Sequence, residues 1–241
     1  LYSKEKQKRS MKTLVIIPSR LSATRLPGKP LLKVNGLSII SHVFKKAEEA
    51  NIGEVIVAAE DQEIVDDVKK NGGQAIITNN YHQTGTDRIY EAFVKLDNPK
   101  IDLIMNLQGD EPLINIEDIK NLNDQMIRYN SNLGTLASLI SDKGLYNNEN
   151  VVKVTTEERL TNINFPDATS FSRKMYDQNK NIYHHLGIYC YQKETLKKFV
   201  SHKQSSNERK YKLEQFRALE NDIKINVCLL YTSDAADELR S

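Results

Sequence analysis

Residues 11–30 read MKTLVIIPSRLSATRLPGKP, an apolar run that passes directly into a loop with several cations. Residues 14–17 are continuously apolar, and the run ends at Pro18. Such a run is typical of a strand that is buried on both faces of a parallel sheet. In open sheets of this kind, ligands bind beyond the carboxyl ends of the strands. The stretch therefore predicts the first strand of an α/β fold and the place where its ligand binds.

Strands and helices alternate from this run to residue 129. The apolar pattern changes between continuous runs and helical spacing, which predicts a mostly parallel sheet with helices on both faces and right-handed crossovers. We expect strands over residues 14–17, 54–58, 74–77 and 103–107, and helices over residues 38–50, 63–71, 87–95 and 116–129.

The pattern loosens after Leu133, where it indicates an α+β excursion around residues 140–190. No Pro-, Gly- or Ser-rich linker divides the chain, so we expect a single domain over residues 11–227. The strands expected here cover residues 135–140, 151–155, 182–191 and 223–227, and the helices cover residues 194–200 and 209–219.

Composition excludes several classes of protein. The 241 residues include 34 Lys and Arg against 32 Asp and Glu, and this near balance argues against general nucleic-acid binding. No apolar run approaches the roughly 20 residues that a membrane helix needs. Cys190 and Cys228 lie far apart in the sequence, which excludes a disulfide framework and a thiolate zinc site. We expect a cytoplasmic protein.

Both ends differ from the rest of the chain. Residues 1–10 read LYSKEKQKRS and are expected to be an upstream extension; a short basic arm that binds nucleic acid is the less favoured interpretation. Residues 228–238 read CLLYTSDAADE, which looks like the in-frame translation of a transposase adapter. We therefore expect a non-native tail over residues 228–241.

Three cations follow the first strand within ten residues: Arg20, Arg25 and Lys29. The turn at Pro27 and Gly28 lies between the second and the third. Cations on a glycine-containing loop at a strand end suit a polyphosphate. GxxxxGK[ST] and GxGxxG are both absent, so neither a Walker loop nor a dinucleotide fingerprint is present. A solvated basic loop is the alternative.

Two other strand ends carry residues that are candidates for ligand binding. Asp110, in the stretch NLQGDEP, can hold a hard cation such as Mg²⁺, although a plain turn residue is the alternative. In HQTGTDR, residues 82–88, Gly85 permits a close backbone approach and Thr86 is predicted to cap the next helix. Helix capping alone is the alternative for that stretch.

The second half has fewer signals. Arg173, the pair His184 and His185, and the pair Glu214 and Gln215 stand out. Adjacent residues of a strand point to opposite faces, so only one histidine can face a pocket. Taken alone, Glu214 and Gln215 are more typical of a helix surface.

In this order, the motifs resemble those of 3-deoxy-manno-octulosonate cytidylyltransferase, also called CMP-Kdo synthetase. The resemblance runs from about Met11 to Val227, and seven segments carry it: IPSRLSATRLPGKPL, HQTGTDR, NLQGDEP, NENVVKV, FSR, HHLGIYCY and LEQFRALE. It implies a Rossmann-like nucleotidyltransferase fold. It also implies Mg²⁺-dependent transfer of CMP from CTP to the acidic sugar Kdo for lipopolysaccharide biosynthesis, by a homodimer.

The resemblance also implies roles for individual residues. Arg20, Arg25 and Lys29 would hold the triphosphate, Gln108 would lie beside the nucleotide, and Asp110 would bind the metal; Arg20, Lys29 and Asp110 would be the catalytic residues. Gly85 and Arg88 would approach the cytosine and ribose. The sugar pocket would be lined by Arg173, His185, Glu214 and Gln215, with Lys153 as a weaker candidate.

The chain departs from the family at three places. Ser22-Ala23-Thr24 stands where the family has Ala-Ser-Thr, and Lys174-Met175 stands where it has Ile-Pro. The family also has a second metal-binding aspartate in a GVDTPEDL-like stretch, which CLLYTSDAADE does not supply; Asp234 and Asp237 should not inherit its role. We therefore expect weak or no activity from the chain as it stands.

Two other functions stay open at this point. The same fold can act on another acidic sugar, such as a sialic acid or an amino-Kdo analogue. The chain can also be a nucleotide-binding protein without catalysis.

Overall fold

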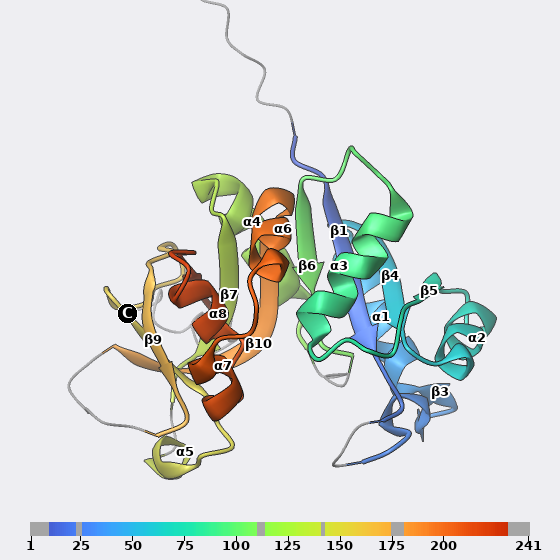
Figure 1. Cartoon of the computed structure of the whole chain (residues 1–241), viewed down its shortest axis with the longest axis horizontal. Helices are drawn as coiled ribbons and strands as arrows, with labels where there is room; N and C mark the ends of the chain where they lie inside the picture. Colours follow the sequence, from blue (N-terminus) through green and yellow to red (C-terminus); the bar gives the residue numbers. More distant parts are fainter. Residues whose placement is uncertain (1–9, 23–25, 110–113, 141–142, 175–180, 231–241) are drawn as a thin grey trace, which may run out of the picture.

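The computed structural model describes residues 10–22, 26–109, 114–140, 143–174 and 181–230. Within them, a nine-stranded sheet has the order β11-β7-β10-β6-β1-β4-β5, and β8 and β9 extend it from β10 (Figure 1). Its strands are β1 Thr13–Ser19, β4 Gly53–Ala59, β5 Ala75–Ile77, β6 Leu103–Asn106, β7 Leu133–Ser138, β8 Lys153–Thr156, β9 Ala168–Ser172, β10 Ile182–Gln192 and β11 Asn226–Leu229. A small hairpin joins β2 Lys33–Val34 to β3 Leu37–Ser38.

The centre of the sheet is parallel. Strand β1 pairs in parallel with both β4 and β6, and β4 pairs in parallel with β5. Strand β10 is antiparallel to β6 and β7, and it also pairs with β8, which in turn pairs with β9. The mixed α/β fold and the α+β excursion are therefore confirmed. The carboxyl ends of β1, β4, β5 and β6 meet at one edge of the sheet.

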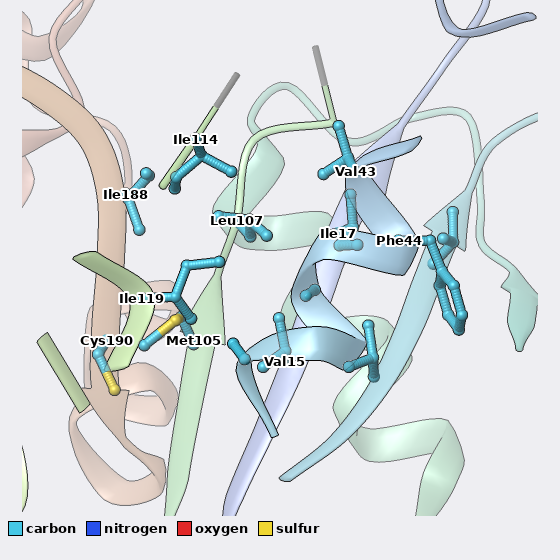
Figure 2. Packing of buried hydrophobic residues seen from close by; sticks show 14 of the residues in the cluster. Val15, Ile17, Val43, Phe44, Met105, Leu107, Ile114, Ile119, Ile188 and Cys190 are labelled. Atoms are coloured by element: carbon cyan, nitrogen blue, oxygen red, sulfur yellow. The ribbon is translucent and has the colours of Figure 1, made fainter. Parts of the chain in front are cut away.

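The helices cover both faces of the sheet, and β1 shows why. Its side chains alternate, so that Val15 and Ile17 join one hydrophobic cluster while Leu14 and Ile16 join the other. The first cluster is covered by α1 Ile39–Ala50, α2 Gln62–Lys70 and α4 Ile116–Tyr129. Figure 2 shows Val43, Phe44 and Ile119 of this cluster beside Val15 and Ile17. The second is covered by α3 Gly85–Leu96, α6 Lys193–Ser201 and α8 Gln215–Leu219. A strand buried on both sides must be apolar throughout, as residues 14–17 are.

The expected elements up to residue 129 all occur, and each boundary lies within two residues of its prediction. The second half differs more. Strand β9 and the short helix α5 Lys143–Asn147 were not predicted there, and in the first half η1 Lys29–Leu31 and the β2–β3 hairpin were not predicted. Strand β11 runs to Leu229, where Cys228 and Leu229 pair with β7. The sheet therefore continues two residues past the predicted end of the domain.

The single helix predicted over residues 209–219 is wrong. The structure has α7 Ser206–Tyr211 and α8, separated by Lys212 in the left-handed conformation with φ 54°. The break lets Glu208 of α7 bind Arg217 of α8 at 2.5 Å. In one straight helix, nine residues span about 13.5 Å and place the two side chains on opposite sides. The buried ion pair therefore requires the break.

The described helices include none long and apolar enough to cross a membrane. Cys190 and Cys228 are both buried free thiols, as expected for a chain without a disulfide framework.

Candidate nucleotide and sugar sites

A pocket of about 280 Å³ lies at the sheet edge where β1 and β6 end and α3 begins. It brings together five residues that the sequence placed at the nucleotide: Arg20, Lys29, Gly85, Arg88 and Gln108. The rest of its lining is Pro18, Ser19, Pro30, His82, Gln83, Thr84 and Gly109. Arg25 and Asp110, which the sequence assigned to the triphosphate and the metal, lie outside the described residues.

The cationic loop is anchored at both of its described ends. The backbone N–H of Leu21 donates to the Asp61 carboxylate at 2.7 Å, and the N–H of Gly28 donates to the carbonyl of Leu21 at 3.0 Å. Gly28 has φ 73°, a conformation that favours glycine. The loop therefore returns on itself and leads into η1, which begins with Lys29. Arg20 is exposed at the end of β1.

The turn after β6 touches both neighbouring strands. A Cβ on Gly109 would lie 2.9 Å from the carbonyl oxygen of Pro18, so this position requires glycine. The side-chain amide of Gln108 donates to the carbonyl of Gly187 at 2.8 Å. Gly187 lies in the irregular stretch of β10 between Leu186 and Tyr189. This contact joins the nucleotide pocket to the strand that carries the two histidines.

Thr84, rather than Thr86, caps α3: its side chain accepts a hydrogen bond from the N–H of Asp87. The prediction of Thr86 as the cap is wrong, because the helix begins two residues earlier than expected. A Cβ on Gly85 would lie 3.3 Å from the ring of Pro18, so the first turn packs closely on the end of β1. The partial positive charge of a helix start favours an anion in the adjacent pocket.

Arg88 lines the pocket but is 2% exposed. Its guanidinium pairs with Glu60 and donates to the Thr78 hydroxyl at 2.6 Å and the Asn79 carbonyl at 3.0 Å. Its charge is therefore balanced within the protein, and its geometry suits holding α3 against β4 and β5.

His82 is a pocket residue that the sequence analysis did not single out, although it lies in the HQTGTDR motif. It pairs with Glu91 of α3. Burial raises the pKa of Glu91, but hydrogen bonds from Lys95 and His82 outweigh this and lower it to about 2. The ionised Glu91 therefore orients the imidazole at the edge of the pocket.

A second polar cluster lies on β10 and at the start of α8. The side-chain amide of Gln215 donates to the Tyr189 hydroxyl at 2.6 Å and lies 3.4 Å from His185 Nδ1. His185 Nε2 is 2.9 Å from the hydroxyl of Thr135. His185, Tyr189 and Gln215 are buried, and Glu214 is half-buried beside them. Tyr189 was not predicted, because nothing marks it among the apolar residues of β10.

Burial shifts the titration of this cluster. It lowers the pKa of His185 to about 3, so the imidazole is neutral at pH 7. It raises the pKa of Glu214 to about 7, against a hydrogen bond from Thr86 and the charge of Arg217, which lower it. Of the two adjacent histidines, His185 is the buried one, while His184 is half-buried.

Arg173 and Lys153 hold loops beside this cluster. Arg173 donates to the carbonyls of Tyr211 and Lys212, which directly precede Leu213 and Glu214. Lys153 is buried and donates to the carbonyls of Asn148 at 2.7 Å and Arg173 at 2.8 Å, and burial lowers its pKa. The structure thus brings His185, Glu214 and Gln215 together. The side chain of Arg173 bonds the backbone of the segment that precedes Glu214.

Three buried side-chain atoms near these sites have no hydrogen-bond partner among the described residues: Ser19 Oγ, Asn106 Oδ1 and Gln215 Oε1. Ser19 lines the pocket, Asn106 ends β6, and Gln215 belongs to the polar cluster. Buried polar atoms nearly always have partners, so these orphaned atoms are positions for a water molecule or for a ligand group.

Over the ranges that the structure describes, no three His, Cys, Asp or Glu side chains form a metal-binding group. The predicted ligand, Asp110, follows Gly109 of the pocket directly in the chain.

Comparison with known proteins gives consistent matches. Residues 14–225 match the sequence model of the cytidylyltransferase family. A 3-deoxy-manno-octulosonate cytidylyltransferase of Rhodopseudomonas palustris is 42% identical over 221 residues, which cover 90% of this chain and 88% of the relative. A protein of the same name from Thermodesulfovibrio yellowstonii is 41% identical over 230 residues, 91% of this chain and 90% of the relative.

The fold agrees with solved structures. CMP:2-keto-3-deoxy-manno-octonic acid synthetase complexed with CTP superimposes with a TM-score of 0.81 at 33% identity, covering 95% of this chain and 97% of that one. A 4-diphosphocytidyl-2C-methyl-D-erythritol synthase from Anaerococcus prevotii has a TM-score of 0.56 at 14% identity, over 93% of this chain and 94% of that one, so it shares the fold.

Proposed function

The chain belongs to the 3-deoxy-manno-octulosonate cytidylyltransferase family and is a nucleotidyltransferase, and on that premise we propose that it transfers CMP from CTP to the anomeric hydroxyl of Kdo, with release of pyrophosphate. One observation carries the proposal: a cationic pocket and a buried polar cluster are joined through the Gln108–Gly187 contact at one sheet edge. We further propose that residues 11–227 form one catalytic domain, and that the enzyme works as a cytoplasmic homodimer in lipopolysaccharide biosynthesis, as its family implies.

Arg20 and Lys29, together with Arg25, would hold the triphosphate. A cation 4 Å from a phosphate oxygen contributes about 4 kcal/mol at an effective dielectric of 20, before desolvation. The N–H groups at the start of α3 would add hydrogen bonds near Gly85. Gln108, held by Gly187, would position the nucleotide against β10.

His185, Glu214 and Gln215 would bind the sugar, with Arg173 beside them. Kdo carries several hydroxyl groups and a carboxylate. Gln215 Oε1 is a buried acceptor that no described residue bonds, and a sugar hydroxyl would satisfy it. The neutral His185 is held by Thr135 and Gln215, so its imidazole lines the site in a fixed orientation.

The carboxylate that follows the pocket in the sequence is the type of ligand that a magnesium ion prefers. Mg²⁺ prefers oxygen ligands and is usually held by one or two carboxylates plus substrate phosphates. Asp110 directly follows the pocket residue Gly109 and would be the protein's carboxylate ligand. When bound, the ion would neutralise phosphate charge and lower the pKa of the attacking hydroxyl.

The reaction is a single in-line displacement at the α-phosphorus. Its barrier falls mainly through alignment and charge neutralisation, with little covalent chemistry for the protein. The polar cluster would fix the sugar so that its anomeric oxygen faces the α-phosphorus. Arg20 and Lys29 would stabilise the charge that develops on the departing pyrophosphate.

The test is pyrophosphate release from CTP and Kdo with Mg²⁺. Two proteins are compared: the 241-residue chain, and a version in which residues 228–241 are replaced by the C-terminal segment of the Rhodopseudomonas relative. We expect release that needs both substrates, weak in the first protein and stronger in the second, and lost on Asp110→Asn. Release with a sialic acid or an amino-Kdo analogue but not with Kdo would contradict the proposed substrate. No release from either folded protein with any of these sugars would leave nucleotide binding without catalysis.

A further inference from the structure

Four consecutive residues at the start of α3 each have a separate contact. Thr84 caps the helix, and Gly85 lines the nucleotide pocket. The hydroxyl of Thr86 donates to Glu214 Oε2 at 2.5 Å, and Asp87 accepts from Arg217 at 3.0 Å. The last two contacts join residues 128 and 130 positions apart in the chain. One helical turn therefore borders the nucleotide pocket and also binds the segment that carries Glu214 and Gln215.

The Arg217 contact makes this connection rigid. Arg217 is 2% exposed, donates to Glu208 at 2.9 and 2.5 Å, and lies 4.7 Å from the ring centroid of Phe199. A buried guanidinium with this many partners holds one geometry. Arg217 thus holds the backbone around Glu214. The orientation of the Glu214 carboxylate itself depends on a separate hydrogen bond.

Thr86 supplies that bond. It is 1% exposed, and its hydroxyl donates to Glu214 and also interacts with the hydroxyl of Tyr191 rather than with the backbone of its own helix. A valine at this position would have nearly the same shape without the donor. The hydroxyl is therefore a separable feature of the turn.

We propose that Thr86 is a positioning residue, whose hydroxyl holds the Glu214 carboxylate in place and so connects the turn at the nucleotide pocket to the sugar-binding residues. The inference deepens the proposed function and rests on it for the identity of the sugar. It assigns no contact between Thr86 and either substrate. Its effect should appear in sugar binding and leave CTP binding unchanged.

The charges around Glu214 make the bond measurable. Arg217 favours its ionised form, while Asp87 and Glu208 oppose it; Tyr189 and Tyr191 of β10 also interact with it. A hydrogen bond to a carboxylate lowers its pKa. Loss of the Thr86 hydroxyl should therefore raise the pKa of Glu214, and an acid limb of activity due to this group should move to higher pH.

The experiment compares Thr86→Val, which removes the hydroxyl, with Thr86→Ser, which keeps it. The pKa of Glu214 is followed in the full chain by NMR with ¹³C-labelled glutamate and assigned with Glu214→Gln. KM for Kdo, KM for CTP and kcat are measured across pH in whichever version of the enzyme releases pyrophosphate. Thr195→Val is the matched control, since Thr195 lies in the first turn of α6 at the opposite end of the sheet, where the N–H of Lys193 donates to the carbonyl of Asp102.

We expect Thr86→Val to raise the Glu214 pKa and to raise KM for Kdo at least about tenfold, the effect of losing a hydrogen bond to a charged group. KM for CTP should stay within about twofold. Thr86→Ser and Thr195→Val should resemble the parent. In the Glu214→Gln background, Thr86→Val should add little further loss, because the bond it removes no longer involves a charge.

Two results would overturn the inference. One is an unchanged Glu214 pKa in a folded Thr86→Val chain. The other is an equal rise in KM for both substrates, which would indicate a general distortion of the turn. The first result does not depend on the proposed function: absence of all transfer activity would refute that function, while the NMR titration would still report on the bond between Thr86 and Glu214.

Discussion

The nucleotide pocket and the sugar-side cluster are built differently. The pocket takes its cations from Arg20 and Lys29, which lie within ten residues of each other after β1. The cluster takes His185 and Tyr189 from β10 and Gln215 from α8, and it buries all three. The difference suits the ligands that we propose for the two sites. A polyphosphate is strongly hydrated and is attracted at a distance, whereas a sugar is recognised by hydrogen bonds that are strong only where water is excluded.

This contrast predicts that the two sides respond differently to substitution. Changes among exposed cations should reduce binding and leave folding intact. Changes in the buried network of the sugar side should reduce the stability of the whole protein, because a buried charge that loses its partner is costly.

The largest effect is expected at Arg217. Arg217→Met removes the partner of Glu208 and Asp87, and breaking a buried pair costs about 3–5 kcal/mol. The free energy of unfolding, measured in urea, should fall by that order. The control is Lys120→Met, which removes an exposed pair with Glu117 on α4 and should cost about 0.5 kcal/mol. Equal losses in the two variants would show that burial does not distinguish the two pairs.

Gly109→Ala should be an exception to this difference between the two sites. Gly109 lies in the nucleotide pocket, but the substitution would disturb the packing of the protein as well. The added Cβ would meet the Pro18 carbonyl at 2.9 Å and Ile40 Cδ1 at 3.2 Å. We expect a loss of about 1–3 kcal/mol in unfolding free energy, as for overpacked cores, together with weaker CTP binding. Gly36→Ala is a useful comparison: its Cβ meets nothing, but its φ of 81° still strains an alanine.

Arg20→Ala tests the opposite case, in which a substitution changes ligand binding and leaves stability unchanged. Arg20 is exposed, so its loss should leave the unfolding free energy nearly unchanged. The dissociation constant for CTP should rise about tenfold, and less at high salt, because exposed charges are screened. Calorimetric titration with CTP at two salt concentrations measures this. Arg128→Ala, an exposed arginine at the end of α4, is the control and should bind CTP normally.

The same contrast explains which features the sequence predicted. The strands before the pocket are continuous apolar runs, and the cations follow them directly, so both could be identified from local order. The network of Glu208, Asp87 and Arg217 joins residues up to 130 positions apart, and no local pattern indicates such pairs. The break at Lys212 depends on that network, so the helix predicted over residues 209–219 was wrong for the same reason.

For some residues the sequence identified the motif but not the contacts that the side chain makes. Arg88 belongs to HQTGTDR, yet its guanidinium is occupied by Glu60 and Thr78, a fact that only the fold provides. Thr86 was expected as a cap and instead binds Glu214, because the helix starts at Gly85. For Arg25 and Asp110, which the structure does not describe, the assigned roles stay predictions.

The smallest net effect is expected for the stability of the parent chain against pH, because Glu214 and His185 act in opposite directions. Burial raises the pKa of Glu214 from 4.5 to about 7, so between these values the folded protein binds more protons than the unfolded chain, and its stability falls as pH rises. Burial lowers the pKa of His185 from 6.5 to about 3, so between those values the unfolded chain binds more protons, and stability rises with pH. The two slopes oppose each other between about pH 5 and 6.5.

Glu214→Gln removes only the first of these slopes. The unfolding free energy of this variant should therefore rise more steeply from about pH 5 to 6.5 than that of the parent, as measured by urea unfolding at several pH values. Glu220→Gln is the control: hydrogen bonds from Ser205 and Asn207 lower the pKa of Glu220, so its titration lies below this range. Identical slopes in the parent and Glu214→Gln would mean that folding does not raise the pKa of Glu214 above its ordinary value. The hydrogen bond from Thr86 and the charge of Arg217 would then offset burial, and the sugar side would present mainly a carboxylate above about pH 5.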